Sequence, residues 1–259
     1  VYIPNGITSI GKMAFCGCEK LITIHIPDNI ANIGQETFCG CSSLTTIHIP
    51  DSVTDIGDEA FFGCYSLSSI EIPASVKQIG QHAFPPNTAI RNASSVIIPP
   101  ISEFDIEHDT LNRYLGNSNS VAIPVSVTHI REAAFKNCTS LTAIKIPASV
   151  SSIGNSAFYG CSNLTSIKIP NNVTSIGNSA FCNCKALISI KIPDSVTNIG
   201  DYAFNRCTSL TSIEIPYGIM SIGYAAFWGC DSLKSVKIPK SVIHIGKYAF
   251  PSDTEIIRI

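Results

Sequence analysis

The sequence contains few charged residues and no long apolar segment. Asp, Glu, Lys and Arg make up 14% of its 259 residues, against roughly 25% in an average soluble domain. Because 45% of the residues are hydrophobic, the composition excludes a disordered chain. The net charge of −2 lacks the basic footprint of a nucleic-acid-binding domain. No apolar run approaches the roughly 18 residues of a membrane-spanning helix, so we expect no membrane insertion.

What the chain does contain is a repeat with a period of 23 residues. Proline, phenylalanine and cysteine each recur at this spacing in two runs, as Phe158, Phe181 and Phe204 illustrate. One unit reads C-x-x-L-x-x-I-x-I-P-x-x-V-x-x-I-G-x-x-A-F-x-x. Periods of this length indicate a solenoid, in which each unit buries its apolar side chains against the neighbouring units.

Each unit is predicted to contain one short strand. In the segment 210–215 isoleucines alternate with polar residues, as in a half-buried strand. Pro216 ends this strand because it has no N–H for the ladder. Gly200 is predicted to allow a tight bend with a positive φ, and 201–204 to form one turn of helix or 3₁₀ that inserts its phenylalanine. The return side of each coil is expected to be mostly extended or 3₁₀.

The repeat resembles a known family. The segments S-L-T-S-I-x-I-P, as in 209–216, and I-G-x-x-A-F-x-x-C, as in 222–230, resemble the BspA-like leucine-rich repeat proteins of the 23-residue type. The resemblance implies an α/β solenoid, a right-handed superhelix with a parallel β-sheet on its concave face. It also implies a surface-exposed or secreted protein that acts in adhesion by binding host or matrix proteins. It supplies no catalytic residues.

The repeat is interrupted in the middle of the chain. We interpret residues 1–259 as a single solenoid with an N-terminal repeat run at 1–92 and a C-terminal run at 121–259. Between them, 93–120 is interpreted as a degenerate repeat with an acidic insertion. Inside it, the Val-Ile-Ile-Pro segment at 96–99 is interpreted as a surviving strand. The stretch from Asp109 to Gly116 carries cap signals at both ends and predicts a short helix.

A second interpretation of this interruption stays open. The segments 84–90 and 250–256 share the pattern F-P-x-(N/D)-T-x-I, and the latter closes the sequence. The first copy is therefore also consistent with the end of an earlier array. In that case the chain holds two sub-arrays with a flexible joint.

Cysteine is frequent, and most of it follows the repeat. Eight of the 11 cysteines occupy the same repeat position, which predicts a ladder of buried free thiols that behave as small hydrophobic residues. Cys16, Cys39 and Cys182 precede the ladder by two residues, at a position with varied residue types that predicts surface exposure. Free thiols, a disulfide between Cys16 and Cys39, and a metal site formed with Cys18 and Cys41 are the alternatives.

The outward strand positions form the candidate binding surface. One column is small and hydroxylic, and the other is charged or polar. The second column consists of His25, His48, Glu71, Lys145, Lys168, Lys191, Glu214 and Lys237. It is either a solvated face that keeps the sheet soluble or a docking strip for an acidic partner. A metal site at His25 and His48 is a third and weaker alternative, because a third ligand is missing.

These patterns predict a binding protein and not an enzyme. An active site needs unlike groups that converge in one pocket, whereas the polar residues here recur in columns, without a phosphate-binding loop or a His-Glu-x-x-His motif. We expect no cofactor, and a protein partner in the extracellular space or at the cell surface. An intracellular scaffold and a structural spacer are the alternatives. The sequence starts at Val1 without a methionine or signal peptide, so we expect a trimmed segment of a longer protein.

Overall fold

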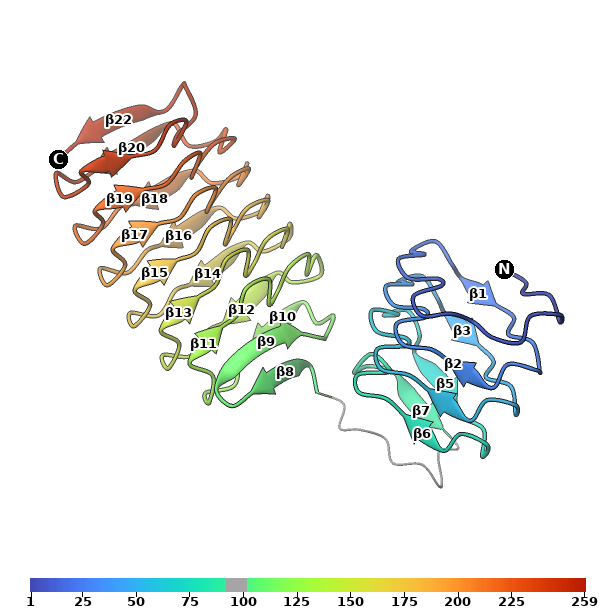
Figure 1. Ribbon diagram of the computed structural model, residues 1–259. Coiled ribbons are helices and arrows are strands. Elements are labelled where there is room, and N and C mark those ends of the chain that lie inside the picture. Colours follow the sequence, from blue (N-terminus) through green and yellow to red (C-terminus); the bar gives the residue numbers. More distant parts are fainter. Residues whose placement is uncertain (92–101) are drawn as a thin grey trace. The chain divides into compact units, whose positions relative to one another are not determined.

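The computed structural model describes residues 1–91 and 102–259, which divide into two compact units (Figure 1). Unit 1 is Val1–Glu103 and unit 2 is Phe104–Ile259. Each unit is a stack of coils made of short strands and turns, and the described residues contain no helix. The fold is therefore a β-solenoid. The expected solenoid with parallel sheets and an extended return side is confirmed. The α/β label does not hold, because the described residues contain no helix, and turns take the place of the expected 3₁₀ segments.

Within residues 1–91, unit 1 contains three small parallel sheets. Two of them contain strands that the isoleucine pattern predicts, namely β1 (Thr23–Ile24) with β3 (Thr46–Ile47), and β5 (Ser69–Glu71), which pairs with the unpredicted β7 (Ala89–Arg91). The third is formed by strands on the return side of the coils, namely β2 (Asn32–Ile33), β4 (Asp55–Ile56) and β6 (Gln78–Ile79).

Unit 2 contains two larger sheets. The seven-stranded sheet is entirely parallel and holds β10 (Ser120–Ala122), β12 (Ala143–Lys145), β14 (Ser166–Lys168), β16 (Ser189–Lys191), β18 (Ser212–Glu214), β20 (Ser235–Ile238) and β22 (Glu255–Arg258). The eight-stranded sheet on the return side holds β8 (Phe104–Glu107), β9 (Thr110–Tyr114), β11 (His129–Ile130), β13 (Ser152–Ile153), β15 (Ser175–Ile176), β17 (Asn198–Ile199), β19 (Ser221–Ile222) and β21 (His244–Ile245).

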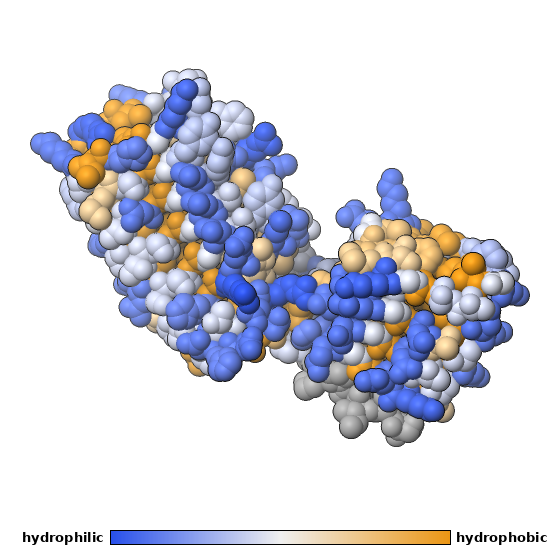
Figure 2. All heavy atoms as spheres, viewed as in Figure 1, coloured by the Kyte–Doolittle hydropathy of each residue, from blue (hydrophilic) through white to orange (hydrophobic). Residues whose placement is uncertain are grey.

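The core of each unit is a set of columns of identical residues. Strand pairing joins residues one period apart, as in Ile190 with Ile213, and the buried phenylalanines stack in the same way. Phe158 lies between Phe135 and Phe181, with ring centroids 5.1 and 5.2 Å away. The hydrophilic side chains lie in rows on the surface of each unit, with hydrophobic ones between them (Figure 2). The predicted stacking is thus confirmed.

Two repeat positions adopt the left-handed conformation, and Gly200 is not one of them. Tyr202, two residues before a column phenylalanine, has φ of 56°, and the equivalent positions of other coils share this conformation. The residue before the ladder cysteine is the second such position, with φ of 72° at Gly160. The predicted positive φ of Gly200 and the predicted helical turn at 201–204 are therefore wrong. Gly200 is instead required for close approach, because a Cβ there would lie 2.7 Å from the backbone nitrogen of Asn178.

The helix predicted from Asp109 to Gly116 is also wrong, because this segment forms β9. β8 and β9 are an antiparallel hairpin, and β9 pairs in parallel with β11. Leu111 lies beside Ile130, and the ring of Tyr114 stacks on Phe135 at 5.3 Å, at the head of the phenylalanine column. The first full coil needs backbone partners along its edge. An extended segment supplies them, whereas a helix of eight residues is marginal and leaves them unpaired.

Each unit ends with the same capping structure. In β7 and β22 the chain adds one last strand to its sheet. The hydroxyl groups of Thr88 and Thr254 donate to the carbonyl oxygens of Leu67 and Leu233 at 2.8 and 2.7 Å. The predicted strand at 96–99 lies outside the described residues. Continuity of a single solenoid through that segment stays a prediction.

Candidate functional site

The strand face of unit 2 presents a row of charged side chains. In β12, β14, β16 and β18 the middle residue is buried and its neighbours on both sides are exposed, and in β20 exposed and buried residues alternate. Lys168 pairs with Lys191, Lys191 with Glu214, and Glu214 with Lys237. Lys145 lies beside Lys168, because each follows directly after the paired residues Ile144 and Ile167 of β12 and β14. We call these five residues the lysine strip. Neighbouring strands in a sheet lie about 4.8 Å apart, so the like charges repel one another and favour an anionic partner.

The corresponding positions of unit 1 are His25, His48 and Glu71, and all three are exposed. The ring of His25 stacks on Tyr2, with centroids 5.4 Å apart and an interplanar angle of 7°. Glu71 pairs with Arg91 across β5 and β7. Throughout residues 1–91 and 102–259, no group of three His, Cys, Asp or Glu side chains could hold a metal ion.

The ladder cysteines point into the core, as predicted. In the inner coils each thiol donates to the carbonyl of a phenylalanine on the preceding coil, as Cys184 does to Phe158 at 3.2 Å. Burial raises the pKa of Cys184 to about 12, so the thiol stays protonated and unreactive. Two ladder cysteines depart from the predicted burial, since Cys18 is exposed and Cys138 is half-buried.

The cysteines that precede the ladder differ from one another. Cys16 is exposed and Cys39 is half-buried, and both are free thiols. Burial raises the pKa of Cys39 to about 12, and the hydrogen-bonded thiol of Cys16 adds to the shift. A disulfide between them stays a prediction. The predicted exposure of Cys182 is wrong, since this residue is 7% exposed. Its thiol contacts the side-chain oxygen of Asn205 at 3.7 Å, and the amide of Asn183 lies 3.6 Å away.

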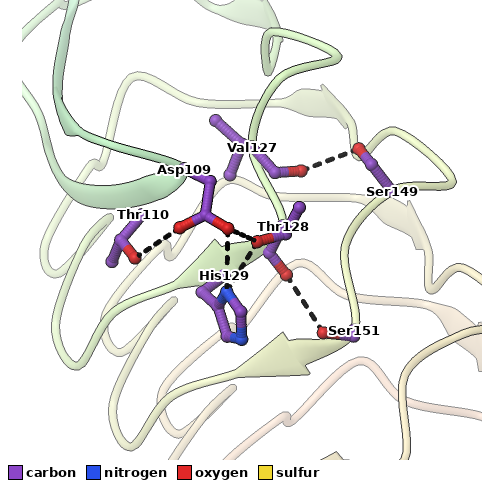
Figure 3. Close-up of polar contacts among 7 residues, drawn as sticks. All are labelled: Asp109, Thr110, Val127, Thr128, His129, Ser149 and Ser151. Atoms are coloured by element: carbon purple, nitrogen blue, oxygen red, sulfur yellow. Dashed lines mark hydrogen bonds and ion pairs between the residues drawn. The ribbon is translucent and has the colours of Figure 1, made fainter.

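A polar cluster that the sequence analysis missed joins the β8–β9 hairpin to the next coil (Figure 3). The Thr128 hydroxyl donates to Oδ2 of Asp109 at 2.6 Å, and Nδ1 of His129 lies 2.6 Å from the same hydroxyl. Because an ionised carboxylate can only accept a hydrogen bond, the Thr128 hydroxyl uses its one proton on Asp109 and offers only lone pairs to Nδ1 of His129. In a nucleophilic triad the hydroxyl and the carboxylate contact opposite nitrogens of the imidazole. Here both face Nδ1, so the cluster fastens the hairpin and forms no triad.

The Asp109 cluster predicts a pH-dependent contribution to the stability of unit 2. The hydrogen bond from Thr128 is the main reason why the pKa of Asp109 lies below its ordinary value. Its contribution is therefore complete above the unfolded pKa, near 3.8, and is lost as the pH falls through the lower folded value. We expect Asp109→Asn to lower the melting temperature at pH 7 and to lower it less at pH 2, as measured by circular dichroism.

The control for this prediction is Asp194→Asn, which changes an exposed aspartate on another coil. This variant should melt as the wild type does at both pH values. Equal melting temperatures of wild type and Asp109→Asn at pH 7 would show that the hydrogen bond from Thr128 adds no stability.

Comparison with known proteins places these features in a family. Residues 1–112, 105–199 and 174–259 match the model described as BspA type leucine-rich repeat region. A leucine-rich cell surface protein from Faecalibacterium prausnitzii is 29% identical, with a TM-score of 0.54 over 93% of this chain and 69% of that protein. A leucine-rich repeat protein from Bacteroides ovatus is 27% identical, with a TM-score of 0.39 over 100% of this chain and 91% of that protein.

A third solved structure, the pneumococcal vaccine antigen PcpA, is 20% identical, with a TM-score of 0.48 over 100% of this chain and 78% of that protein. The comparison with curated proteins found no match. Among the described residues no helix has the length and apolar character needed to span a membrane. The family match extends over both units and agrees with their stacked parallel strands. The chain therefore belongs to the BspA-type leucine-rich repeat family.

Proposed function

We propose that the chain is a non-enzymatic recognition module that binds an acidic protein partner through the lysine strip of unit 2. The observation that carries this proposal is the register of Lys145, Lys168 and Lys191 on three adjacent strands. With four lysines and Glu214, the strip has a net charge of +3. A row of like charges on a flat sheet steers an oppositely charged partner and fixes its orientation.

We further propose that this module acts at the cell surface or outside the cell, as an adhesion or recognition protein. The support is the likeness to the Faecalibacterium prausnitzii protein, which is described as a cell surface protein. His25, His48 and Glu71 would form the contact surface of unit 1. In an oxidising compartment we expect the adjacent thiols of Cys16 and Cys39 to form a disulfide.

An intracellular scaffold is the second candidate function. The observation that favours it is the set of free cysteines in both units, because free thiols persist in reducing compartments. A structural spacer within a larger surface protein would need no binding face at all. The binding test of the lysine strip separates a spacer from both recognition functions.

The lysine strip is tested by charge reversal. We expect the triple variant Lys145→Glu, Lys168→Glu and Lys191→Glu to bind at least about tenfold more weakly at low salt, because three exposed contacts of up to about 1 kcal/mol each are lost. Binding is measured by surface plasmon resonance against a panel of purified extracellular-matrix proteins. The difference should shrink at high salt, where exposed charges are screened.

The matched control reverses three exposed lysines of unit 2 that lie outside the strip, namely Lys136, Lys240 and Lys247. This variant has the same net charge as the test variant and should bind as the wild type does. If both triple variants lose binding equally, total charge and not the strip governs the association. If neither loses binding, the proposal is wrong.

A further inference from the structure

Unit 2 contains an unusual residue at one of its left-handed turn positions. Five coils have glycine before the ladder cysteine, and Asn137 and Asn183 occupy this position in two others, all with positive φ. Arg206 occupies the same position with φ of 58°. The left-handed conformation costs an ordinary residue roughly 1–2 kcal/mol relative to the right-handed one. Arg206 is thus the residue of this column that is neither glycine nor asparagine.

The side chain of Arg206 is held in place by the next coil. Its guanidinium lies over the ring of Trp228, with Cζ 5.6 Å from the centroid, and its backbone N–H donates to the Trp228 carbonyl at 2.8 Å. Gly229 leaves room for this arrangement, since a Cβ there would lie 3.2 Å from Cγ of Arg206. Trp228 remains 46% exposed. The pair thus forms a rigid platform of an aromatic ring and a planar cation at the surface.

This platform forms one wall of a half-open pocket of about 480 Å³. That volume lies in the range of small-molecule sites. The other lining residues come from adjacent coils and from the C-terminal cap, and they include Asn183, Lys185, Thr208, Asp231 and Asp253. All of them belong to unit 2, and apart from Asp253 they lie on the turns that contain the ladder cysteines, outside the strands that carry the lysine strip.

The charges around the pocket are only partly paired. Asp253 forms an ion pair with Lys234 at 2.6 Å. Within residues 102–259, Lys185, Arg206 and Asp231 have no ion pair, and the guanidinium of Arg206 lies over the ring of Trp228. The pocket therefore offers two free cations, one free carboxylate and an aromatic face. A ligand that satisfies all of them has an acidic group, several hydroxyl groups and an apolar ring face.

We propose that this pocket binds a uronic acid unit of an acidic saccharide. The sugar carboxylate pairs with Arg206 and Lys185, since a guanidinium fork recognises carboxylates through two parallel hydrogen bonds. Sugar hydroxyl groups donate to Asp231, and the C–H face of the pyranose ring packs on Trp228. An apolar ligand would leave the charged groups of the pocket unsatisfied, and an inorganic anion would leave the aromatic face unused.

The test uses Trp228 as its own reporter, because it is the only tryptophan of the chain. Selectively excited tryptophan fluorescence of the intact protein is titrated with methyl glucuronide and with methyl glucoside, which differ only at the C6 carboxylate. We expect saturable changes with both sugars and at least about tenfold tighter binding of the glucuronide, the effect of a hydrogen-bonded charge. Absence of saturation with the glucuronide, or equal affinities for both sugars, overturns the proposal.

An acidic peptide is the competing class of ligand. Titration with N-acetylglutamate presents a carboxylate without a sugar ring, and we expect it to bind at least about tenfold more weakly than methyl glucuronide. Equal affinity for the two compounds would show a simple carboxylate site and overturn the saccharide assignment.

Two substitutions at equivalent repeat positions separate binding from folding. Arg206→Gly removes the cation and relieves the left-handed strain, so we expect at least tenfold weaker glucuronide binding together with an unchanged or higher melting temperature. Asn137→Gly makes the same change outside the pocket and should leave binding unaltered. If Arg206→Gly retains full affinity, or if Asn137→Gly loses affinity equally, the pocket is not the binding site.

Discussion

Phe158→Ala is expected to destabilise unit 2 by about 3–5 kcal/mol, the cost of truncating a large buried aromatic side chain. Phe158 is completely buried and lies between two nearly parallel rings, with interplanar angles of 13° to Phe135 and 3° to Phe181. Truncation removes the contacts on both faces of the ring and leaves a cavity that the neighbouring coils fill only partly. The loss is a large fraction of the 5–15 kcal/mol that stabilises a typical domain.

The control for Phe158 is Phe250, which ends the same column. Phe250 is half-buried and stacks on a single ring, that of Phe227 at 5.1 Å. Phe250 buries less surface than Phe158, and its truncation removes one stacking contact instead of two. Phe250→Ala should therefore cost clearly less free energy of unfolding than Phe158→Ala. Urea unfolding followed by far-ultraviolet circular dichroism gives both values. Equal losses would mean that the number of stacked neighbours does not determine the contribution of a coil.

This comparison tests the general character of the fold. In a solenoid the stability of a coil depends on its immediate neighbours, so residues at the same repeat position contribute unequally at the ends and in the middle. The capping segments reduce this difference. Tyr114 covers the first column phenylalanine of unit 2, while β22 pairs with β20 at the other end.

The residues that follow the period could be predicted from the sequence, and those that depart from it could not. Columns such as Phe158 and Phe181 repeat at one spacing, so a single coil defines the position of each in every other coil. The β8–β9 hairpin does not follow the 23-residue period. Its strand β9 pairs with β11 so that Leu111 lies beside Ile130, and not beside a residue 23 positions away. Periodicity carries no information on such a shift, and the cap signals around the segment favoured a helix.

Of the two candidate sites, the lysine strip follows the repeat and could be predicted from the sequence, whereas the pocket beside Arg206 could not. The exposure of Lys145, Lys168 and Lys191 follows from strand alternation, and the structure shows all three exposed. The pocket beside Arg206 depends on side chains from three columns and on a turn conformation, which no single column reveals. One signal was nevertheless present in the sequence, because a column dominated by glycine and asparagine contains a single arginine.

Gly177→Ala is expected to destabilise unit 2 by about 3 kcal/mol, at the upper end of the usual cost of overpacking. A Cβ at this position would lie 2.7 Å from the backbone nitrogen of Asn155 and from the carbonyl carbon of Gly154. Both contacts are with the backbone of the preceding coil, so a side-chain rotation cannot relieve them. The coils must move apart, which lengthens the hydrogen bonds of the neighbouring strands β13 and β15.

Gly11 is the matched control, because it occupies the same repeat position in the first coil and a Cβ there would meet nothing within 4 Å. Neither glycine has a positive φ, so alanine is compatible with the backbone at both sites. At Gly11 only the effect on the unfolded chain remains, and Gly11→Ala should stabilise the protein by about 0.4–1 kcal/mol. The effect of glycine-to-alanine substitution on the free energy of unfolding thus has opposite signs at the two sites, depending on whether another coil packs against the glycine. If urea unfolding shows both variants to be stabilised, close approach of the coils is not the reason for this glycine.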